Sequence, residues 1–136
     1  ELFVEELFVI VPTTHPLAMQ ESVKLDEVKN EPFIAIKKGN SLRQLVDEFF
    51  LDAGIELNTT FAAEEMHTVA GFVGAGMGIS LIPNIKGLDH YKVKRLKVDP
   101  PCYRSVGVSW AKNRYLPPAV VEFRQYLLNY FQQREV

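Results

Sequence analysis

A cluster of three glycines is the feature of this sequence that first suggests chemistry. It reads Gly74-Ala75-Gly76-Met77-Gly78, and glycine-rich loops cradle the phosphates of nucleotides when they leave a strand and open a helix. Here the order is reversed, because the cluster follows a helical pattern over 64–74 and precedes an apolar run over 79–82. A helix C-terminus carries the negative end of the helix dipole, which disfavours an anion. The cluster therefore predicts a tight turn between a helix and a strand, where glycine permits a positive φ.

Histidine, cysteine and serine supply the other candidates for chemistry. His15, His67 and His90 lack the spacing of a local metal motif, and Cys102 is the only cysteine, so we expect no metal site. Ser41 does not lie in the G-x-S-x-G elbow of a hydrolase, and nothing marks a general acid and base. We therefore expect no catalytic residues and no cofactor, and we predict that the chain is not an enzyme.

The clearest element is a helix that begins at Ser41. Ser41 and Gln44 form the S-x-x-Q pattern of a capping box, and Gly54 stands where a left-handed residue commonly ends a helix. Between them runs one apolar stripe at the helical period, made of Leu42, Leu45, Val46, Phe49, Phe50 and Ala53.

Short apolar runs alternate with helical patterns along the whole chain. Such alternation implies crossover connections, so we predict an α/β fold with a mixed, mainly parallel sheet flanked by helices. The lysine-bearing run over 91–98 is expected at a sheet edge, where charge prevents pairing with another chain. Pro117-Pro118 should open a last helix that buries Val120, Phe123, Leu127 and Phe131. The expected strands cover 6–11, 33–36, 59–63, 79–82, 91–98 and 104–110, with a short helical turn over 25–28.

Composition bounds the protein class. The chain has 136 residues, of which 47% are hydrophobic and 24% charged, with 15 basic and 17 acidic residues; this suits one globular domain. A nucleic-acid binder normally shows a basic excess, and no apolar run is long enough to span a membrane. The N-terminus lacks the basic start of a signal peptide, and one cysteine favours a reducing, cytoplasmic compartment. The first residue, Glu1, suggests a piece of a longer protein.

Two helix starts are the expected ligand site. The helix at Ser41 and the helix beginning near 65–68 each follow a strand, so both should lie beyond the carboxyl ends of the sheet. Ligands of open α/β sheets bind at that edge, and exposed N–H groups there suit a carboxylate or another anion. This geometry predicts a place for a ligand without identifying the ligand.

Three motifs resemble the effector-binding domains of LysR-type transcriptional regulators. The strand run 6–12 is followed by His15-Pro16-Leu17-Ala18, which is similar to the family's "hpla" turn. The segment 73–83, which contains the glycine cluster and ends in Leu81-Ile82-Pro83, looks like the family's most recognisable signature. The segment 114–119 with Phe123 is similar to the close of such a domain. The motifs come in the family's order and span nearly the whole chain.

The resemblance implies a two-lobed fold like that of type 2 periplasmic binding proteins, with a small-molecule effector in the cleft between lobes. Residues 1–136 would be a partial effector-binding domain, in which 12–83 form the second regulatory lobe and 84–136 the closing strands and the C-terminal return helix. The DNA-binding domain would be absent, so DNA would be contacted only through a missing N-terminal domain. Carried over by position, the effector-binding residues would be Asn40, Ser41, Met66, His67 and Thr68.

The resemblance also implies a homo-oligomer formed through the regulatory domain, and the exposed side of the helix over 69–74 is the contact surface expected here. Two other interpretations remain open. A lobe of a solute-binding protein from a transport system would share the fold, and a signal peptide upstream would favour it. A small α/β enzyme could use His67 or Ser41 with a nucleotide at the glycines, and it would lose nucleotide binding when Gly76 is replaced.

Overall fold

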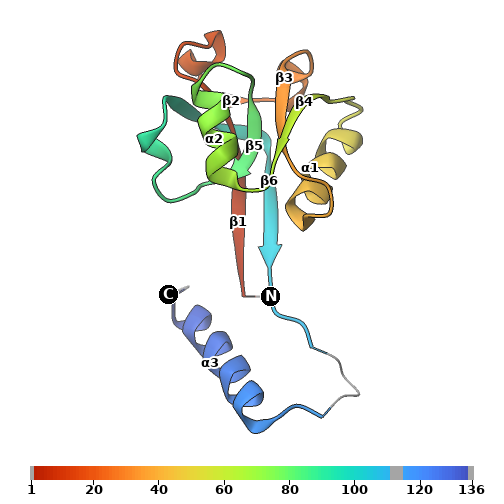
Figure 1. Ribbon diagram of the computed structural model, residues 1–136, viewed down its shortest axis with the longest axis vertical. Coiled ribbons are helices and arrows are strands. Elements are labelled where there is room, and N and C mark those ends of the chain that lie inside the picture. The colour runs from red at the N-terminus through yellow and green to blue at the C-terminus, as the bar shows by residue number, and fades with distance from the viewer. Residues whose placement is uncertain (1, 111–114, 135–136) are drawn as a thin grey trace. The chain divides into compact units, whose positions relative to one another are not determined.

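The computed structural model describes residues 2–110 and 115–134. These residues form two compact units (Figure 1). The larger comprises Glu6–Cys102, and the smaller comprises Glu1–Glu5 with Tyr103–Val136. Strands β1 (Phe3–Pro12) and β6 (Val93–Val106) contribute residues to both.

The four-stranded sheet has the order β2-β6-β1-β5, where β2 is Ser22–Val23 and β5 is Ser80–Pro83. β1 pairs antiparallel with β5, with Ile10 opposite Ser80, and β2 pairs parallel with β6. β1 and β6 are also antiparallel, because Leu2 N–H donates to Val106 O at one end and Thr13 N–H donates to Lys92 O at the other. The expected α/β fold with a mixed sheet is confirmed, but β1 has antiparallel neighbours on both sides, so this four-stranded sheet is not mainly parallel as predicted.

The lysine-bearing run is not an edge strand, so that expectation is wrong. β6 lies between β1 and β2, and it is one continuous strand where the sequence suggested two, over 91–98 and 104–110. Its lysines alternate with the buried Leu96 and Val98, and Lys94 pairs with Glu21 at 3.3 Å. Alternation shows that one face meets solvent, and an inner strand with one solvated face alternates in the same way as an edge strand.

A second, two-stranded sheet is flanked by helices. β3 (Pro32–Ile36) and β4 (Asn58–Ala63) pair in parallel, with Ile36 opposite Ala63. β3 also approaches the start of β5, where Ile34 N–H donates to Ile79 O at 2.8 Å and Ile79 N–H donates to Pro32 O at 2.9 Å. Helices α1 (Ser41–Asp52) and α2 (Met66–Gly74) lie on either side of these strands (Figure 1). Short 3₁₀ turns complete the unit, at Pro16–Met19, Leu25–Val28 and Leu88–His90.

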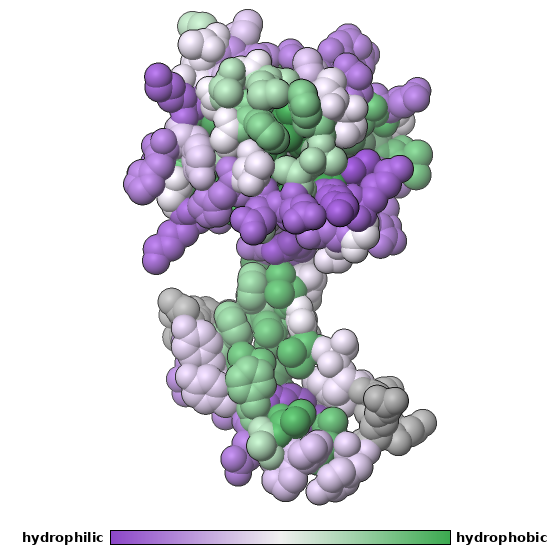
Figure 2. All heavy atoms as spheres, in the orientation of Figure 1, coloured by the Kyte–Doolittle hydropathy of each residue, from purple (hydrophilic) through white to green (hydrophobic). Residues whose placement is uncertain are grey.

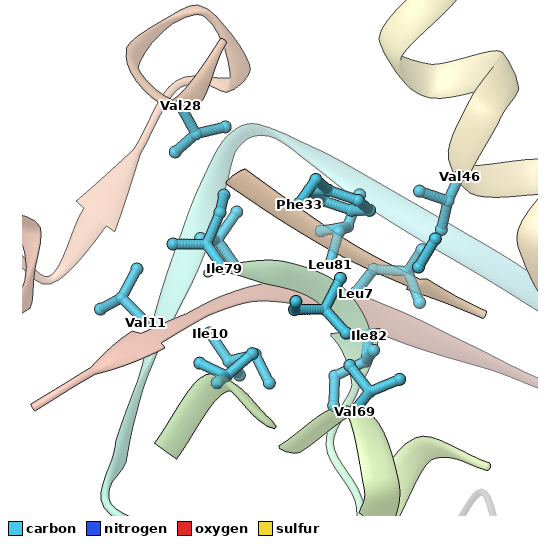
Figure 3. Close-up of a cluster of buried hydrophobic side chains, with 14 of the residues drawn as sticks. Leu7, Ile10, Val11, Val28, Phe33, Val46, Val69, Ile79, Leu81 and Ile82 are labelled. Carbon is cyan, nitrogen blue, oxygen red and sulfur yellow. The ribbon is translucent and has the colours of Figure 1, made fainter. Parts of the chain in front are cut away.

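The hydrophobic core joins both sheets and both helices. Figure 3 shows buried side chains from β1, β3, β5, α1 and α2 converging on one another. Phe33 of β3 packs edge to face on Phe50 of α1, with ring centroids 5.4 Å apart. The apolar runs over 6–11 and 33–36 are therefore core strands, as predicted.

The glycine cluster ends α2 and leads into β5, which confirms the predicted direction. Gly76 has a φ of +83°, the left-handed conformation that glycine adopts without strain. Gly78 is restricted by space, because a Cβ there would lie 2.5 Å from Pro32 O. The cluster thus shapes the scaffold at a helix C-terminus.

The smaller unit carries helix α3 (Pro118–Arg134), which the proline pair Pro117-Pro118 opens as predicted. The expected buried stripe is wrong for this chain: Val120 is 46% and Phe123 61% exposed, and Leu127 and Phe131 are half-buried. Figure 2 shows apolar residues gathered on this unit. An apolar stripe identifies the side of a helix that avoids water, and the pattern does not identify what covers it. Arg114 of the third motif lies outside the described residues.

Cys102 is expected to be chemically inert in the folded chain. It is 4% exposed, and burial, with a smaller contribution from the Glu6 carboxylate, raises the pKa of its thiol. Because the thiolate is the reactive form, we predict at least about tenfold slower alkylation by iodoacetamide near pH 8 than in urea. The reaction can be followed by mass spectrometry, and equal rates in both states would contradict this assignment.

The raised pKa of Cys102 also predicts that the free energy of unfolding falls at alkaline pH. The folded state holds the thiol proton more tightly than the unfolded state. The contribution of the thiol to the free energy of unfolding is therefore intact below the unfolded pKa of about 8.5, and it is lost as pH rises through the folded pKa. In Cys102→Ala, urea unfolding curves should no longer show this decrease in the free energy of unfolding at alkaline pH.

Candidate functional site

The two helix starts expected to bind a ligand lie beyond neighbouring strand ends. Because β3 and β4 are parallel and Ile36 is paired with Ala63, both strands end at the same edge. Lys37 N–H donates to Ala63 O at 2.8 Å, and Lys37 Nζ lies 3.4 Å from Glu64 Oε1, so the two connections are joined. α1 and α2 begin directly after them, which is the position from which an open α/β sheet binds ligands.

Asn40, not Ser41, caps α1. Asn40 Oδ1 accepts a hydrogen bond from Leu42 N–H at 2.8 Å, and the Asn40 backbone is extended. The predicted Ser41–Gln44 capping box is therefore wrong, because asparagine one residue earlier is an equally good cap and takes the N-cap position. Ser41 becomes the first helical residue and is exposed. Its hydroxyl has no hydrogen-bond partner within the described part of the chain, which leaves it available to a ligand.

Arg43 fixes the first turn of α1 to the sheet. Its Nη1 donates to Ile36 O at 3.0 Å, and its Nε lies 3.0 and 3.1 Å from the two carboxylate oxygens of Asp47. The side chain is only 12% exposed. Sequence reasoning missed this residue, since a single arginine on a helix gives no sign that it returns to the preceding strand.

The start of α2 has no side-chain cap. Glu65 occupies the N-cap position without a capping hydrogen bond, and Val69 N–H is the first to find a helical carbonyl, that of Glu65. The backbone N–H groups of Met66, His67 and Thr68 therefore form no hydrogen bond within residues 2–110 and 115–134. Free N–H groups at the positive end of a helix dipole suit an anionic group.

His67 is held by a tyrosine that the sequence analysis did not single out. His67 Nδ1 lies 3.1 Å from the hydroxyl of Tyr91, and the ring centroids are 6.0 Å apart. The two residues are 24 positions apart, so no local spacing rule could have paired them.

Two of the pockets in the described part of the chain bear on these helix starts. One of about 400 Å³ beside α1 is lined in part by Lys38, Asn40, Ser41 and Gln44. The other, of about 510 Å³, is lined by the segment from Asn84 to Asp89 together with Val93 and Arg95. Neither is lined by Met66, His67 or Thr68, so the five predicted residues share a sheet edge but not one of these hollows.

The described residues contain neither a cluster of metal ligands nor a membrane-spanning helix. No three histidine, cysteine, aspartate or glutamate side chains within 2–110 and 115–134 are placed to hold a metal ion. Among the same residues, no helix combines the length and apolar character needed to cross a membrane.

Sequence comparison places the chain among regulators. The family model described as the LysR substrate binding domain matches residues 1–132. The uncharacterized HTH-type transcriptional regulator YybE of Bacillus subtilis strain 168 is 48% identical over 134 residues, covering 98% of this chain and 46% of YybE. The transcriptional dual regulator GltC of the same organism is 31% identical over 137 residues, again covering 98% and 46%. The chain thus spans about half the length of these relatives, which are transcriptional regulators and not enzymes.

Structure comparison gives the same result. The effector binding domain of QuiR, solved in complex with shikimate, superposes with a TM-score of 0.85 at 29% identity, covering 97% of this chain and 64% of that domain. The LysR family regulator HinK from Pseudomonas aeruginosa superposes with a TM-score of 0.78 at 24% identity, covering 95% of this chain and 46% of HinK. The fold and the match over nearly the whole sequence agree, and the chain belongs to the LysR substrate binding domain family, the effector-binding domains of LysR-type transcriptional regulators.

Proposed function

We propose that this chain senses a small-molecule effector and thereby controls DNA binding by the regulator that contains it. The observation that carries the proposal is the shared sheet edge at which the exposed Ser41 hydroxyl and the uncapped start of α2 lie, in a family whose domains bind effectors. Effector binding would favour one arrangement of the lobes, and the change would be transmitted to the DNA-binding domain.

The proposed domain division follows from this role. Residues 12–83 are assigned to the second regulatory lobe, and 84–136 to the closing strands and the return helix. The remaining lobe and the DNA-binding domain would come from the part of the relatives' length that this chain does not span. A regulator that acts on DNA would work in the cytoplasm.

The proposed effector is a small organic acid. Free N–H groups of Met66, His67 and Thr68 favour a carboxylate, and the Ser41 hydroxyl can donate to the same group or to a hydroxyl of the ligand. The QuiR domain, whose structure is a complex with shikimate, provides one relative in which such a compound is bound.

Self-association is proposed through the exposed side of α2. Phe72 of α2 contacts Phe61 of β4 with ring centroids 5.8 Å apart, and Phe61 remains 46% exposed. Apolar residues gather on the face of the molecule where α2 lies (Figure 2). Exposed aromatic side chains beside a helix are typical of contact surfaces, and analytical ultracentrifugation of the Phe61→Ser variant would test the assignment.

The effector site is tested with the protein expressed from its complete reading frame. Shikimate and other small carboxylates would be screened by thermal shift and by their effect on DNA binding. Ser41→Ala should weaken binding of the compound found by about three- to tenfold, the effect of one lost hydrogen bond. Thr59→Val serves as a matched control, because Thr59 is exposed at the opposite end of β4.

Two results would overturn the proposal. Binding that is unchanged in Ser41→Ala would place the effector elsewhere. A complete reading frame with a signal peptide in place of a DNA-binding segment would favour the alternative, a solute-binding protein of a transport system.

A further inference from the structure

Tyr91 packs along one flank of α2. His67, Gly71 and Gly74 follow one another at i, i+4 and i+7, so they lie on one side of the helix. A Cβ at Gly71 would lie 3.8 Å from Tyr91 Cε1, and one at Gly74 would lie 3.7 Å from Tyr91 Cβ. Both distances are ordinary van der Waals separations, so Tyr91 packs along this flank of the helix and its ring runs toward the helix start.

The hydroxyl of Tyr91 reaches His67 at the end of this flank. The distance between Tyr91 Oη and His67 Nδ1 is 3.1 Å. Within the described part of the chain, the Nε2 atom of His67 has no hydrogen-bond partner. The hydrogen bond made by one ring nitrogen of a neutral histidine decides which nitrogen carries the proton.

A tight turn holds Tyr91 in place. Gly87, at φ +84°, precedes the 3₁₀ turn Leu88–His90, and Tyr91 N–H donates to Leu88 O at 3.1 Å. Leu88 is buried and anchors the turn in the core. A Cβ built at Gly87 would lie 3.9 Å from His67 Cε1, so this turn lies close to the imidazole ring.

We propose that Tyr91 is a positioning residue that donates its hydroxyl proton to His67 Nδ1 and so fixes His67 as the Nε2–H tautomer. His67 then presents a hydrogen-bond donor in the first turn of α2, beside the free backbone N–H groups. The consequence rests on the proposed function: His67 Nε2–H and the free backbone N–H groups of Met66, His67 and Thr68 would together offer donors to an acceptor group of the effector, such as a carboxylate.

The tautomer is measured directly by nuclear magnetic resonance on the ¹⁵N-labelled chain near pH 8, where histidine side chains are ordinarily neutral. His15 is an internal standard, because Leu17 N–H donates to its Nδ1 at 3.0 Å and its Nε2 lies 2.9 Å from Glu31 Oε1. That geometry requires the Nε2–H tautomer. His67 should show the same pattern as His15, with well separated resonances for its two ring nitrogens.

Tyr91→Phe removes only the hydroxyl and keeps the ring on its glycine flank. The two His67 nitrogen resonances should then move toward each other as the tautomers mix, while those of His15 stay in place. Tyr115→Phe, which removes an exposed hydroxyl elsewhere, should leave both histidines unchanged. A wild-type His67 protonated at Nδ1, or His67 resonances that Tyr91→Phe leaves in place, would overturn the proposal. No effector enters this measurement, so a failed effector screen and a failed tautomer assignment remain distinguishable.

Discussion

Phe50→Ala is expected to lower the free energy of unfolding of this chain by about 3–5 kcal/mol, the usual cost of truncating a buried phenylalanine. Phe50 is 1% exposed, and its ring packs edge to face on Phe33. The substitution removes that aromatic contact and leaves a cavity between α1 and β3. Because the α1 start carries Asn40 and Ser41, the same variant should also loosen the proposed effector site.

The neighbouring Leu51→Ala variant is the matched control. Leu51 lies on the same helix but is 75% exposed, and alanine is a good helix former, so its effect should stay within about 0.5 kcal/mol. Urea unfolding followed by circular dichroism gives both values. Similar losses for the two variants would show that α1 does not pack on the sheet through Phe50.

Gly78→Ala is expected to cost about 2–4 kcal/mol although it adds a single methyl group. The added Cβ would lie 2.5 Å from Pro32 O and 3.1 Å from Pro32 C. Both are backbone atoms of Pro32, the first residue of β3, and they cannot move aside as a side chain can. Relieving the clash would separate β3 from the start of β5 and weaken the hydrogen bonds between Ile34 and Ile79 and between Ile79 and Pro32.

Gly71→Ala tests whether the effect belongs to the position or to the residue type. Gly71 lies within α2, where a Cβ would meet only Tyr91 Cε1 at an ordinary 3.8 Å. Alanine in a helix interior is favoured over glycine by up to about 1 kcal/mol, so this variant should be neutral or slightly more stable. A Gly78→Ala chain as stable as the wild type would contradict the close approach of the two strands.

Local patterns were sufficient to predict most elements of the larger unit. The core strands, the glycine turn and the end of α1 before the left-handed Gly54 follow from hydrophobic period and from glycine's access to positive φ, which act over a few residues. The capping box failed because Asn40 and Ser41 are both good caps, and one residue decides between them. The edge strand failed because alternation records solvent on one face and does not record which strands lie alongside.

Some features of the candidate site follow from local sequence, and others depend on tertiary contacts. The sequence by itself determined the α/β class, the direction of the glycine turn and the two helix starts after strands, since each depends on residues that are close along the chain. Only the tertiary structure decided that Arg43 returns to Ile36, that Tyr91 lies on the glycine flank of α2 beside His67, and that α3 leaves Phe123 exposed. Those contacts join segments whose separation in sequence is variable, and no periodicity encodes which surfaces meet once the chain is folded.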